Sequence, residues 1–345
     1  MKANLIILFI AIFLFSCSNK NKYEDSQEFK FDDFVATENL IGAVVEFDSL
    51  IMRPWDIFVK DSILITIEPA EEKLFHVFNL KTRKKITECI TKGQGPKDMI
   101  HPEFMNSNGS NIVVFDHATS TIFEYEITDL VNNPDPTPVR RIKLEEEIYT
   151  CAQQIGNYIA GNSYWGKHQL NIFDMTGKKI NAIIDYPTSS IPYSDMEKMD
   201  AYYMKFITND SDKIVICYYM TDLIEIYNLD GILQKRLHGP EQFFVRVKER
   251  GGNISGTSLL KGTRDSYFQP RSAGDKFFVL YNGGDIYDPA HTSSCKRLFS
   301  FSWDGTPKII YNLNDPIHNF AVDKKNKKIY GISETPEVHI VAYSY

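Results

Sequence analysis

The sequence has none of the short motifs that mark common hydrolases and metal sites. It contains no G-x-S-x-G elbow, no H-E-x-x-H pair and no D-x-D-x-D-G calcium loop. It also has no C-x-x-C pair of the kind that holds structural zinc. Motifs therefore identify no catalytic residue and no metal ligand, and we expect neither cofactor nor metal on this basis.

Cysteine is scarce and widely spaced. After Cys17, the remaining four are Cys89, Cys151, Cys217 and Cys295, each more than fifty residues from the next. If the chain is exported, disulfides are allowed, and four cysteines permit three connectivities. Their apolar neighbours and their dispersal favour the alternative, buried free thiols.

Positive charge is also in deficit. The formal net charge is -7, and it becomes about -8 once Lys2 is removed with the leader described next. A mildly acidic body lacks the basic footprint of a nucleic-acid-binding protein. We therefore expect no nucleic-acid partner.

One long apolar run is present, from Leu5 to Phe15, and Lys2 precedes it. The run is short for a bilayer span and is typical of a secretory signal. It ends in Leu14-Phe15-Ser16-Cys17, which resembles the bacterial lipobox. That resemblance implies cleavage before Cys17 and acylation of this cysteine, and several acyl chains give stable anchoring. We expect a signal peptide over 1–16 and an acylated, flexible tether over 17–30, the alternative being an ordinary signal peptide with an incidental cysteine.

The residues after Cys17 bear on location. A Lys-Asn-Lys tract comes first, and the acidic pair Glu24-Asp25 lies too far along for a strong surface-export signal. We expect the outer membrane as the site of anchoring, on its periplasmic face rather than the cell surface. The lipid makes the membrane one partner, and an envelope protein is another candidate; the sequence does not indicate an oligomeric state.

Long helical periodicity is absent, and a different period takes its place. A pair of β-rich runs joined by a polar turn recurs six times, at intervals of 46 to 63 residues. The first runs of these pairs align on Ile63, Ile112, Tyr158, Ile214, Phe277 and Ile329. Each interval has room for two further strands, which makes a four-stranded unit.

Six such units predict an all-β, six-bladed β-propeller of four-stranded antiparallel blades over residues 31–345. An early strand near 43–47 could pair with the last blade and close the ring, which would remove exposed strand edges. A β-sandwich with irregular loops is the alternative.

The stretch KGQGPKDMIHPEF, residues 92–104, offers two interpretations. Its glycines could wrap a phosphate, but Pro96 removes an amide donor and no helix follows. The second interpretation is a turn between one blade and the next, in which Gly93 and Gly95 supply positive φ. We favour the turn.

This stretch, together with the strand pair that follows it, resembles an NHL-type propeller repeat, with Pro102 before the inner strand. The lipobox, the GQGP turn and six blades are together similar to the TolB-like six-bladed propeller lipoproteins of Bacteroidota. The resemblance implies a propeller on a lipid tether. Lys97-Asp98 stands where that family often has Gly-Glu.

In a propeller the innermost strands line a central channel, which is the usual binding region. The predicted inner strands place polar and aromatic residues near the axis. These channel candidates are Arg53, His101, Glu103, Tyr149, Tyr203, Lys205, Tyr267, Arg271 and His318. Arginine with tyrosine and histidine suits a small anionic or sugar-like ligand. The alternative is that these residues are polar only because the channel is wet.

Two further functions stay open. Some six-bladed propellers hydrolyse lactones or esters with a channel calcium, and Glu103, Asn319 and Asp56 could hold such an ion. A scaffold that binds a protein is the other, because insertions after Tyr281 and after His238 enlarge the fourth and fifth blades. The function expected first is a lipid-anchored binding or interaction module.

Overall fold

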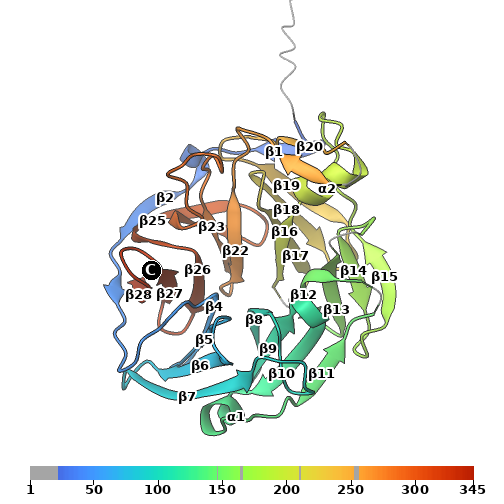
Figure 1. Cartoon of the computed structure of the whole chain (residues 1–345). Helices are drawn as coiled ribbons and strands as arrows, with labels where there is room; N and C mark the ends of the chain where they lie inside the picture. The colour runs from blue at the N-terminus through green and yellow to red at the C-terminus, as the bar shows by residue number, and fades with distance from the viewer. Residues whose placement is uncertain (1–21, 146, 164–165, 210, 252–255) are drawn as a thin grey trace, which may run out of the picture.

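The computed structural model describes residues 22–145, 147–163, 166–209, 211–251 and 256–345. Six sheets, one for each blade, stand around a central channel, each with the first of its antiparallel strands innermost (Figure 1). The predicted six-bladed propeller is confirmed. The second strands β5, β9, β13, β17, β23 and β27 begin at or one residue before the positions at which the six repeats align.

The strands of blades 1 to 3 follow one another along the chain. Blade 1 consists of β4 (Asp56–Lys60), β5 (Ile63–Ile67), β6 (Lys73–Asn79) and β7 (Lys84–Thr91). Blade 2 consists of β8 (Pro102–Asn108), β9 (Asn111–Asp116), β10 (Thr121–Glu126) and β11 (Arg140–Lys143). Blade 3 consists of β12 (Tyr149–Ile155), β13 (Tyr158–Ser163), β14 (Leu170–Phe173) and β15 (Lys179–Ile183).

Blades 4 to 6 each add an outer strand from the amino-terminal segment. Blade 4 consists of β16 (Met204–Thr208), β17 (Lys213–Tyr218), β18 (Leu223–Asn228), β19 (Leu233–His238) and β1 (Ser26–Glu28). Blade 5 consists of β22 (Tyr267–Ser272), β23 (Lys276–Tyr281), β24 (Cys295–Ser302), β25 (Pro307–Ile317) and β2 (Ala36–Leu40). Blade 6 consists of β26 (Asn319–Asp323), β27 (Lys328–Ser333), β28 (His339–Ser344) and β3 (Ala43–Val44).

The hydrophobic core is divided among the interfaces between blades. Strand side chains alternate between the two faces of a sheet, and neighbouring blades cover both faces. Six clusters of buried residues result, one between each pair of adjacent blades. The interface between blades 4 and 5 is rich in aromatic rings, with Phe299 stacked on Tyr281 at a centroid distance of 4.8 Å.

The ring is closed by the expected early strand. β3 pairs antiparallel with the last strand β28, through Val44 opposite Val341 and Ala43 opposite Ala342. The Val45 amide extends the pairing by donating to the Ile340 carbonyl at 2.8 Å. Because the first and last segments of the chain share one blade, opening the ring requires separating them.

The amino-terminal segment does more than close the ring. β1 lies parallel to β19 and β2 lies parallel to β25, so one segment supplies the outermost strand of blades 4, 5 and 6 in turn (Figure 1). We call residues 22–45 the strap. The expected tether over 17–30 therefore overlaps the folded body, because its described part from Tyr23 onward packs against blade 4.

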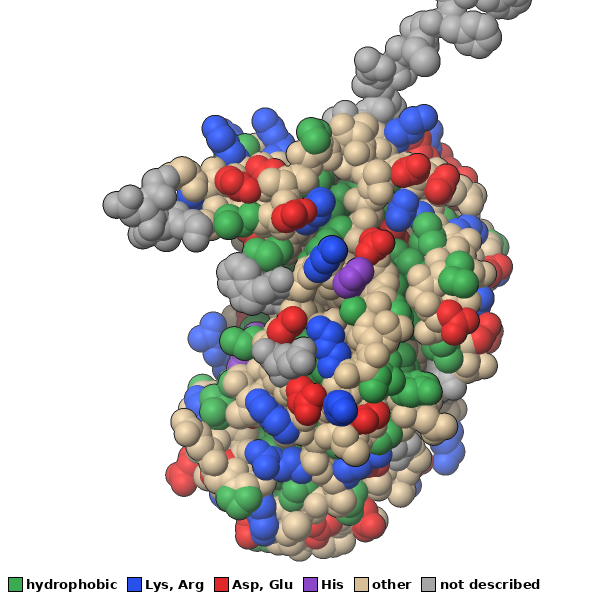
Figure 2. Space-filling model, turned by 90° about the vertical axis from the view of Figure 1, so that its right-hand side faces the viewer, with side chains coloured by type: hydrophobic (Ala, Val, Ile, Leu, Met, Phe, Trp, Pro, Cys, Tyr) green, Lys and Arg blue, Asp and Glu red, His purple; other side chains and the backbone are tan. Residues whose placement is uncertain are grey.

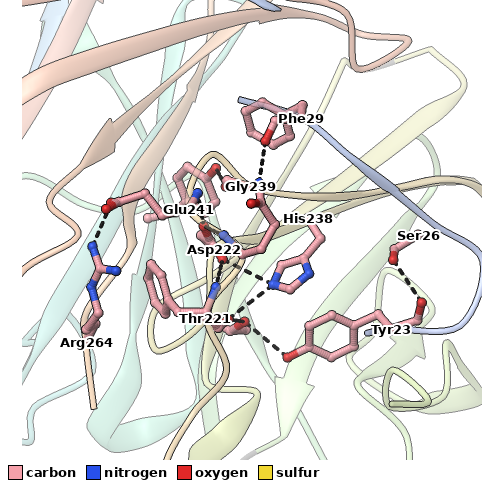
Figure 3. Close-up of polar contacts among 12 residues, drawn as sticks. Tyr23, Ser26, Phe29, Thr221, Asp222, His238, Gly239, Glu241 and Arg264 are labelled. Atoms are coloured by element: carbon pink, nitrogen blue, oxygen red, sulfur yellow. Dashed lines mark hydrogen bonds and ion pairs between the residues drawn. The ribbon is translucent and has the colours of Figure 1, made fainter. Parts of the chain in front are cut away.

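A network of hydrogen bonds fixes the start of the strap (Figure 3). Tyr23, which is 1 % exposed, donates from its hydroxyl to Thr221 Oγ1 at 3.1 Å. The adjacent Asp222 carboxylate accepts the amides of Glu241, Gln242 and Phe243 at 2.7 to 3.0 Å and lies 3.2 Å from His238 Nε2. The strap thus begins on a buried polar anchor in blade 4.

In the part of the chain that the structure describes, helical structure is confined to connections. The helices are α1 (Ile127–Asn132), α2 (Asp195–Ala201) and the 3-10 turns η1 (Phe31–Asp33) and η2 (His117–Thr119). A small hairpin of β20 (Val247–Glu249) and β21 (Thr257–Leu259) packs beside α2. Among the described residues, no helix is long and apolar enough to cross a membrane.

The two expected insertions lie against each other. The connection after β23 meets the connection after β21, where the Asp265 amide donates to the Gly284 carbonyl at 3.0 Å. The imidazole of His291 lies 3.0 Å from the Asp265 carboxylate. The insertions therefore form one packed layer over blades 4 and 5.

The four cysteines after Cys17 are all buried and unpaired, as expected for free thiols. Burial raises the pKa of the Cys151 thiol to about 11 and that of Cys89 to about 12, so neither is an ionised nucleophile at neutral pH. Cys17 lies outside the described residues.

The GQGP turn joins the outer strand β7 of blade 1 to the inner strand β8 of blade 2, which confirms the structural interpretation. The reason given for its glycines was wrong, since neither Gly93 nor Gly95 is among the residues with positive φ. Instead, the Asp98 carboxylate folds back and accepts the Gly95 amide at 2.9 Å. A Cβ at Gly93 or Gly95 would lie 2.5 or 2.7 Å from that carboxylate. An acidic group of the chain itself fills the loop that a phosphate would need.

Candidate functional site

The inner strands all begin on one face of the ring, and their first residues surround the mouth of the channel. A cavity of about 210 Å³ opens there. It is lined by Trp55, Glu103, Tyr203, Lys205, Tyr219, Phe268, Gln269, Ser293 and His318. Four of the nine channel candidates, Glu103, Tyr203, Lys205 and His318, belong to this lining.

Two ion pairs cross the channel beneath the mouth. Lys205 of blade 4 donates to Glu103 Oε2 of blade 2 at 2.8 Å. Arg271 of blade 5 donates to Asp56 Oδ1 of blade 1 at 2.7 Å. Each pair joins blades that are two places apart in the ring, so together they tie the inner strands across the axis.

Hydrogen bonds connect these pairs to the blades between them. Lys205 Nζ donates to the Thr150 carbonyl of blade 3 at 3.3 Å, and Arg271 donates to Asn319 Oδ1 of blade 6 at 3.0 Å. Asp56 also accepts the Met105 amide of blade 2 at 3.0 Å. All six blades thus contribute to one polar layer, in which both cations are already paired with carboxylates.

The Glu103 and Lys205 charges are mutually stabilised despite burial. Burial alone raises the pKa of Glu103, but the Lys205 ammonium and then His117 outweigh it and lower that pKa to about 2. Burial lowers the pKa of Lys205, and Glu103 outweighs this in turn, so the pKa is raised. The layer is therefore a buried salt bridge with both members ionised at neutral pH.

The wall above this layer is aromatic. Tyr219 makes edge contacts with Tyr203 at 5.1 Å and with Phe268 at 4.8 Å between ring centroids. Trp55 is 47 % exposed at the rim. The amide of Gln269 and the hydroxyl of Ser293, which comes from the insertion in blade 5, add polar groups. Such a wall combines stacking surfaces with a few hydrogen-bonding groups.

His318, which lines this site, has a buried hydrogen-bonding atom without a partner among the described residues. Its Nε2 lies 3.3 Å from the Pro54 carbonyl, which can only accept, so Nε2 bears the proton. Burial lowers the pKa of the imidazole, which is therefore neutral at pH 7. Its Nδ1 is then an acceptor, and this buried atom has no partner among the described residues.

Apart from Arg271, which lies in the polar layer, the other channel candidates lie outside the cavity lining. Tyr149 and Tyr267 are fully buried in the cores between blades, where their hydroxyls donate to the carbonyls of Glu145 and Gly239. They were placed in the channel wrongly, because the side chains of an inner strand point toward neighbouring blades as well as toward the axis. Arg53 is exposed outside the cavity lining, and His101 is half-buried beside Trp55 at 6.2 Å between ring centroids.

The residues considered for calcium do not form an open oxygen site. The Arg271 guanidinium binds both Asp56 and Asn319, and Asn319 also donates to Asp56 Oδ1 at 3.0 Å. A calcium ion between these two residues would have to displace a cation that the chain already supplies. Glu103 lies apart from these two residues in the polar layer and has one carboxylate oxygen, Oε2, bound by Lys205.

Sequence patterns did not indicate Trp55, Tyr219, Phe268, Gln269 or Ser293. Tyr219 follows the second strand of blade 4, and Ser293 comes from an insertion, so neither lies on a predicted inner strand. Trp55 and Phe268 do lie in predicted inner-strand segments, but only charged, histidine and tyrosine residues were singled out there.

The outer surface shows no concentration of one charge on the side that carries α2 and β15. Figure 2 shows acidic and basic side chains interspersed over that face. That face therefore carries no continuous patch of one charge among the described residues.

Solved structures with the same fold are distant in sequence. A member of the DUF4221 family from Bacteroides vulgatus superposes with a TM-score of 0.58 at 9% identity, covering 94% of this chain and 98% of that one. A protein of Bacteroides fragilis described as exported gives a TM-score of 0.55 at 11% identity, with 92% and 98% covered. At these identities the likeness concerns the fold alone.

Sequence comparison gives the family. No curated protein matches the chain. The model of the TolB-like 6-blade propeller-like family matches residues 31–325, which is most of the chain and includes all six inner strands. With the six blades described above, this match shows that the chain belongs to the TolB-like six-bladed propeller family.

Proposed function

We propose that this protein is a lipid-anchored binding protein of the cell envelope whose channel mouth holds one uncharged, hydroxyl-rich ring such as a sugar unit. The observation that carries the proposal is a cavity with an aromatic wall that is also lined by His318, whose buried acceptor Nδ1 has no partner among the described residues. A buried acceptor without a partner is costly, and a ligand that donates a hydrogen bond would satisfy it.

The charge of the site favours an uncharged ligand over the anion that the sequence also allowed. Lys205 and Arg271 are each paired with a carboxylate, so neither offers a free positive charge. An ionised carboxylate only accepts hydrogen bonds, and it could not donate to His318 Nδ1. A hydroxyl can donate to Nδ1 and accept from Gln269.

The shape of the site favours a small ring. The cavity of about 210 Å³ is below the roughly 300–1,000 Å³ of drug-sized ligand pockets. The apolar C–H face of a sugar ring can stack on Trp55 or Phe268, while its hydroxyls reach the polar groups. This arrangement fits a single ring, at the end of a longer glycan or alone.

The test is a binding screen with matched charged and uncharged probes. The panel contains glucose, galactose, mannose and N-acetylglucosamine, with glucuronate and citrate as the anionic probes. Binding is measured as a shift in melting temperature and by calorimetric titration. We expect at least one uncharged sugar to bind, and we expect Trp55→Ala and Phe268→Ala each to weaken it at least tenfold.

The matched control is Trp303→Ala. Trp303 packs on Phe277 at the edge of blade 5 and lies outside the cavity lining, so this substitution should leave sugar affinity unchanged. Binding of the anionic probes alone, or equal affinity in all three variants, would overturn the proposal.

The anchoring part of the proposal rests on the leader and on the strap. Tyr23, the start of the buried anchor, follows Cys17 by six residues, which span about 20 Å when extended. An acyl group on Cys17 would therefore hold blade 4 close to the bilayer. The exported Bacteroides fragilis protein of similar fold supports an envelope location.

Two measurements test the anchor. Cys17→Ala should move the protein from the membrane fraction to the soluble fraction, with loss of acyl mass. Labelling of intact cells with a membrane-impermeant reagent then tests the face, where the proposal expects no labelling before the outer membrane is opened. Membrane association that survives Cys17→Ala would contradict the anchor.

A further inference from the structure

A second cluster of chemistry-bearing side chains adjoins the channel mouth and goes beyond the proposed sugar site. His101, Glu103 and His117 each direct one ligand atom toward the others, and these three atoms lie within 4.8 Å of one another. Among the described residues this is the group of histidine, cysteine and acidic side chains with such a geometry. We propose that these three residues form a site for a divalent transition-metal ion such as Zn²⁺.

The pairing of two strands builds the cluster. β8 and β9 are antiparallel, with Pro102 opposite Asp116, and the His117 amide donates to the His101 carbonyl at 3.0 Å. His101 therefore lies just before β8 and His117 lies just after β9, at the same end of the strand pair. The Asp116 carboxylate fixes this end of the hairpin, since it accepts the amides of Ile100 and His101 at 3.1 and 2.9 Å.

The spacing of the ligand atoms suits a small ion. His117 Nδ1 lies 3.3 Å from Glu103 Oε1. Bonds of about 2.0–2.1 Å from zinc to nitrogen or oxygen place neighbouring ligands of a tetrahedron about 3.4 Å apart. The ligand atom of His101 lies within 4.8 Å of the other two, and His101 is half-buried, so its side chain has room to adjust to an ion.

Glu103 is prepared to act as a ligand. Lys205 binds Oε2 at 2.8 Å, which leaves Oε1 on the side of His117. A carboxylate ligand held by a second hydrogen bond is the usual arrangement around protein-bound metals.

The ligand types select the metal. Two imidazoles and one carboxylate suit zinc and other borderline transition metals, whereas Ca²⁺ prefers six to eight oxygen ligands. Three protein ligands also leave one coordination position open. His117 keeps 34% of its side chain exposed, so an ion can reach the site from solvent.

The contact between His117 and Glu103 has a competing explanation, which is an ion pair with a protonated histidine. The two explanations differ in what they predict for added metal. The full chain, purified without a polyhistidine tag and treated with chelator, is titrated with Zn²⁺ by calorimetry. In a separate measurement Co²⁺ is added, and its visible absorption reports nitrogen and oxygen coordination.

We expect one Zn²⁺ per chain, and at least tenfold weaker binding in both His101→Ala and His117→Ala, because loss of even an outer-shell partner costs 10- to 100-fold. The control is His168→Ala, since His168 is half-buried and pairs with Asp185 on blade 3. Absence of stoichiometric Zn²⁺ binding, or equal affinity in both variants and the wild type, would overturn the site.

The metal site and the sugar site can fail separately. Metal titrations need no sugar, and Phe268→Ala alters the wall on blade 5, opposite blade 2 in the ring, so it should leave Zn²⁺ affinity unchanged. If one of the variants His101→Ala and His117→Ala does not fold, the cobalt spectrum of the other variant still tests the site. Each histidine supplies a separate nitrogen ligand, so the loss of either one should change the spectrum.

Discussion

Lys205 Nζ lies 2.8 Å from Glu103 Oε2, although 102 residues separate them in the sequence, and both side chains are nearly excluded from solvent. The pair spans the channel from blade 4 to blade 2, with Arg271 and Asp56 forming its counterpart from blade 5 to blade 1. The charged residues on the inner strands therefore serve mainly to hold the blades together across the channel. The aromatic residues at the channel mouth are the ones available to contact a ligand.

The Lys205 substitution tests this closure. Lys205→Met leaves Glu103 buried without its cation, and removing one partner of a buried pair costs about 3–5 kcal/mol. We expect a loss of this size in the free energy of unfolding measured with urea. The double variant Glu103→Gln with Lys205→Met should recover part of the loss, because no unpaired charge remains. A loss below about 1 kcal/mol for the single variant would contradict the assignment.

The acid sensitivity of the protein should depend on Glu103. Its pKa is about 2 in the folded chain and about 4.3 when unfolded, so the unfolded state binds the proton first as the pH falls. The stability from this group is complete above about pH 5 and is lost toward pH 2, a change of about 3 kcal/mol. In chelator, the stability difference between the wild type and Glu103→Gln should shrink over this range. A difference that is constant with pH would count against the low pKa.

The closing strand should tolerate no side chain at Gly42. A Cβ there would lie 2.3 Å from Val341 Cγ2 and 2.6 Å from the Tyr343 ring, both on the last strand β28. Overpacking of this kind costs about 1–3 kcal/mol. We expect Gly42→Ala to lower the melting temperature, while Gly251→Ala, which meets nothing within 4 Å, should not. Equal melting temperatures for the two variants would place the strap outside the cooperative unit.

The four buried cysteine thiols should not react in the native protein. Cys89, Cys151, Cys217 and Cys295 are buried, and burial raises the pKa of each. In the Cys17→Ala variant, which has four cysteines left, we expect no reaction with an aromatic disulfide reagent before denaturant is added and four thiols afterward. Fewer than four after unfolding without reductant would indicate a disulfide instead.

Much of the fold is predictable from the sequence because strand pairs leave a local pattern. The six second strands begin where the β-rich runs align, and the closing strand lies where an early run precedes the first repeat. The start of the strap was not foreseen. β1 is three residues long and polar, and its place in the ring depends on blade 4, about 200 residues later.

The site is less predictable, since it depends on which way each inner-strand side chain points. Tyr149, Tyr203 and Tyr267 all lie on predicted inner-strand segments. Only Tyr203 lines the cavity, whereas Tyr149 and Tyr267 fill the cores between blades. His117 was missed for another reason, because it lies after a second strand and reaches His101 only through the β8–β9 register. The predicted hairpin of β8 and β9 implies this register, so the proximity of His117 to His101 could in principle be predicted from the sequence.

The most direct test of the central proposal is fluorine NMR of the chain labelled with 5-fluorotryptophan. The sequence has three tryptophans, so three resonances are expected, and single substitutions assign them. Titration with the panel of uncharged sugars should shift the resonance of Trp55 at the channel mouth and leave that of Trp303 in place. Shifts of Trp303 alone, or no shift of Trp55 with any sugar up to saturating concentration, would contradict a ligand site at the mouth of the channel.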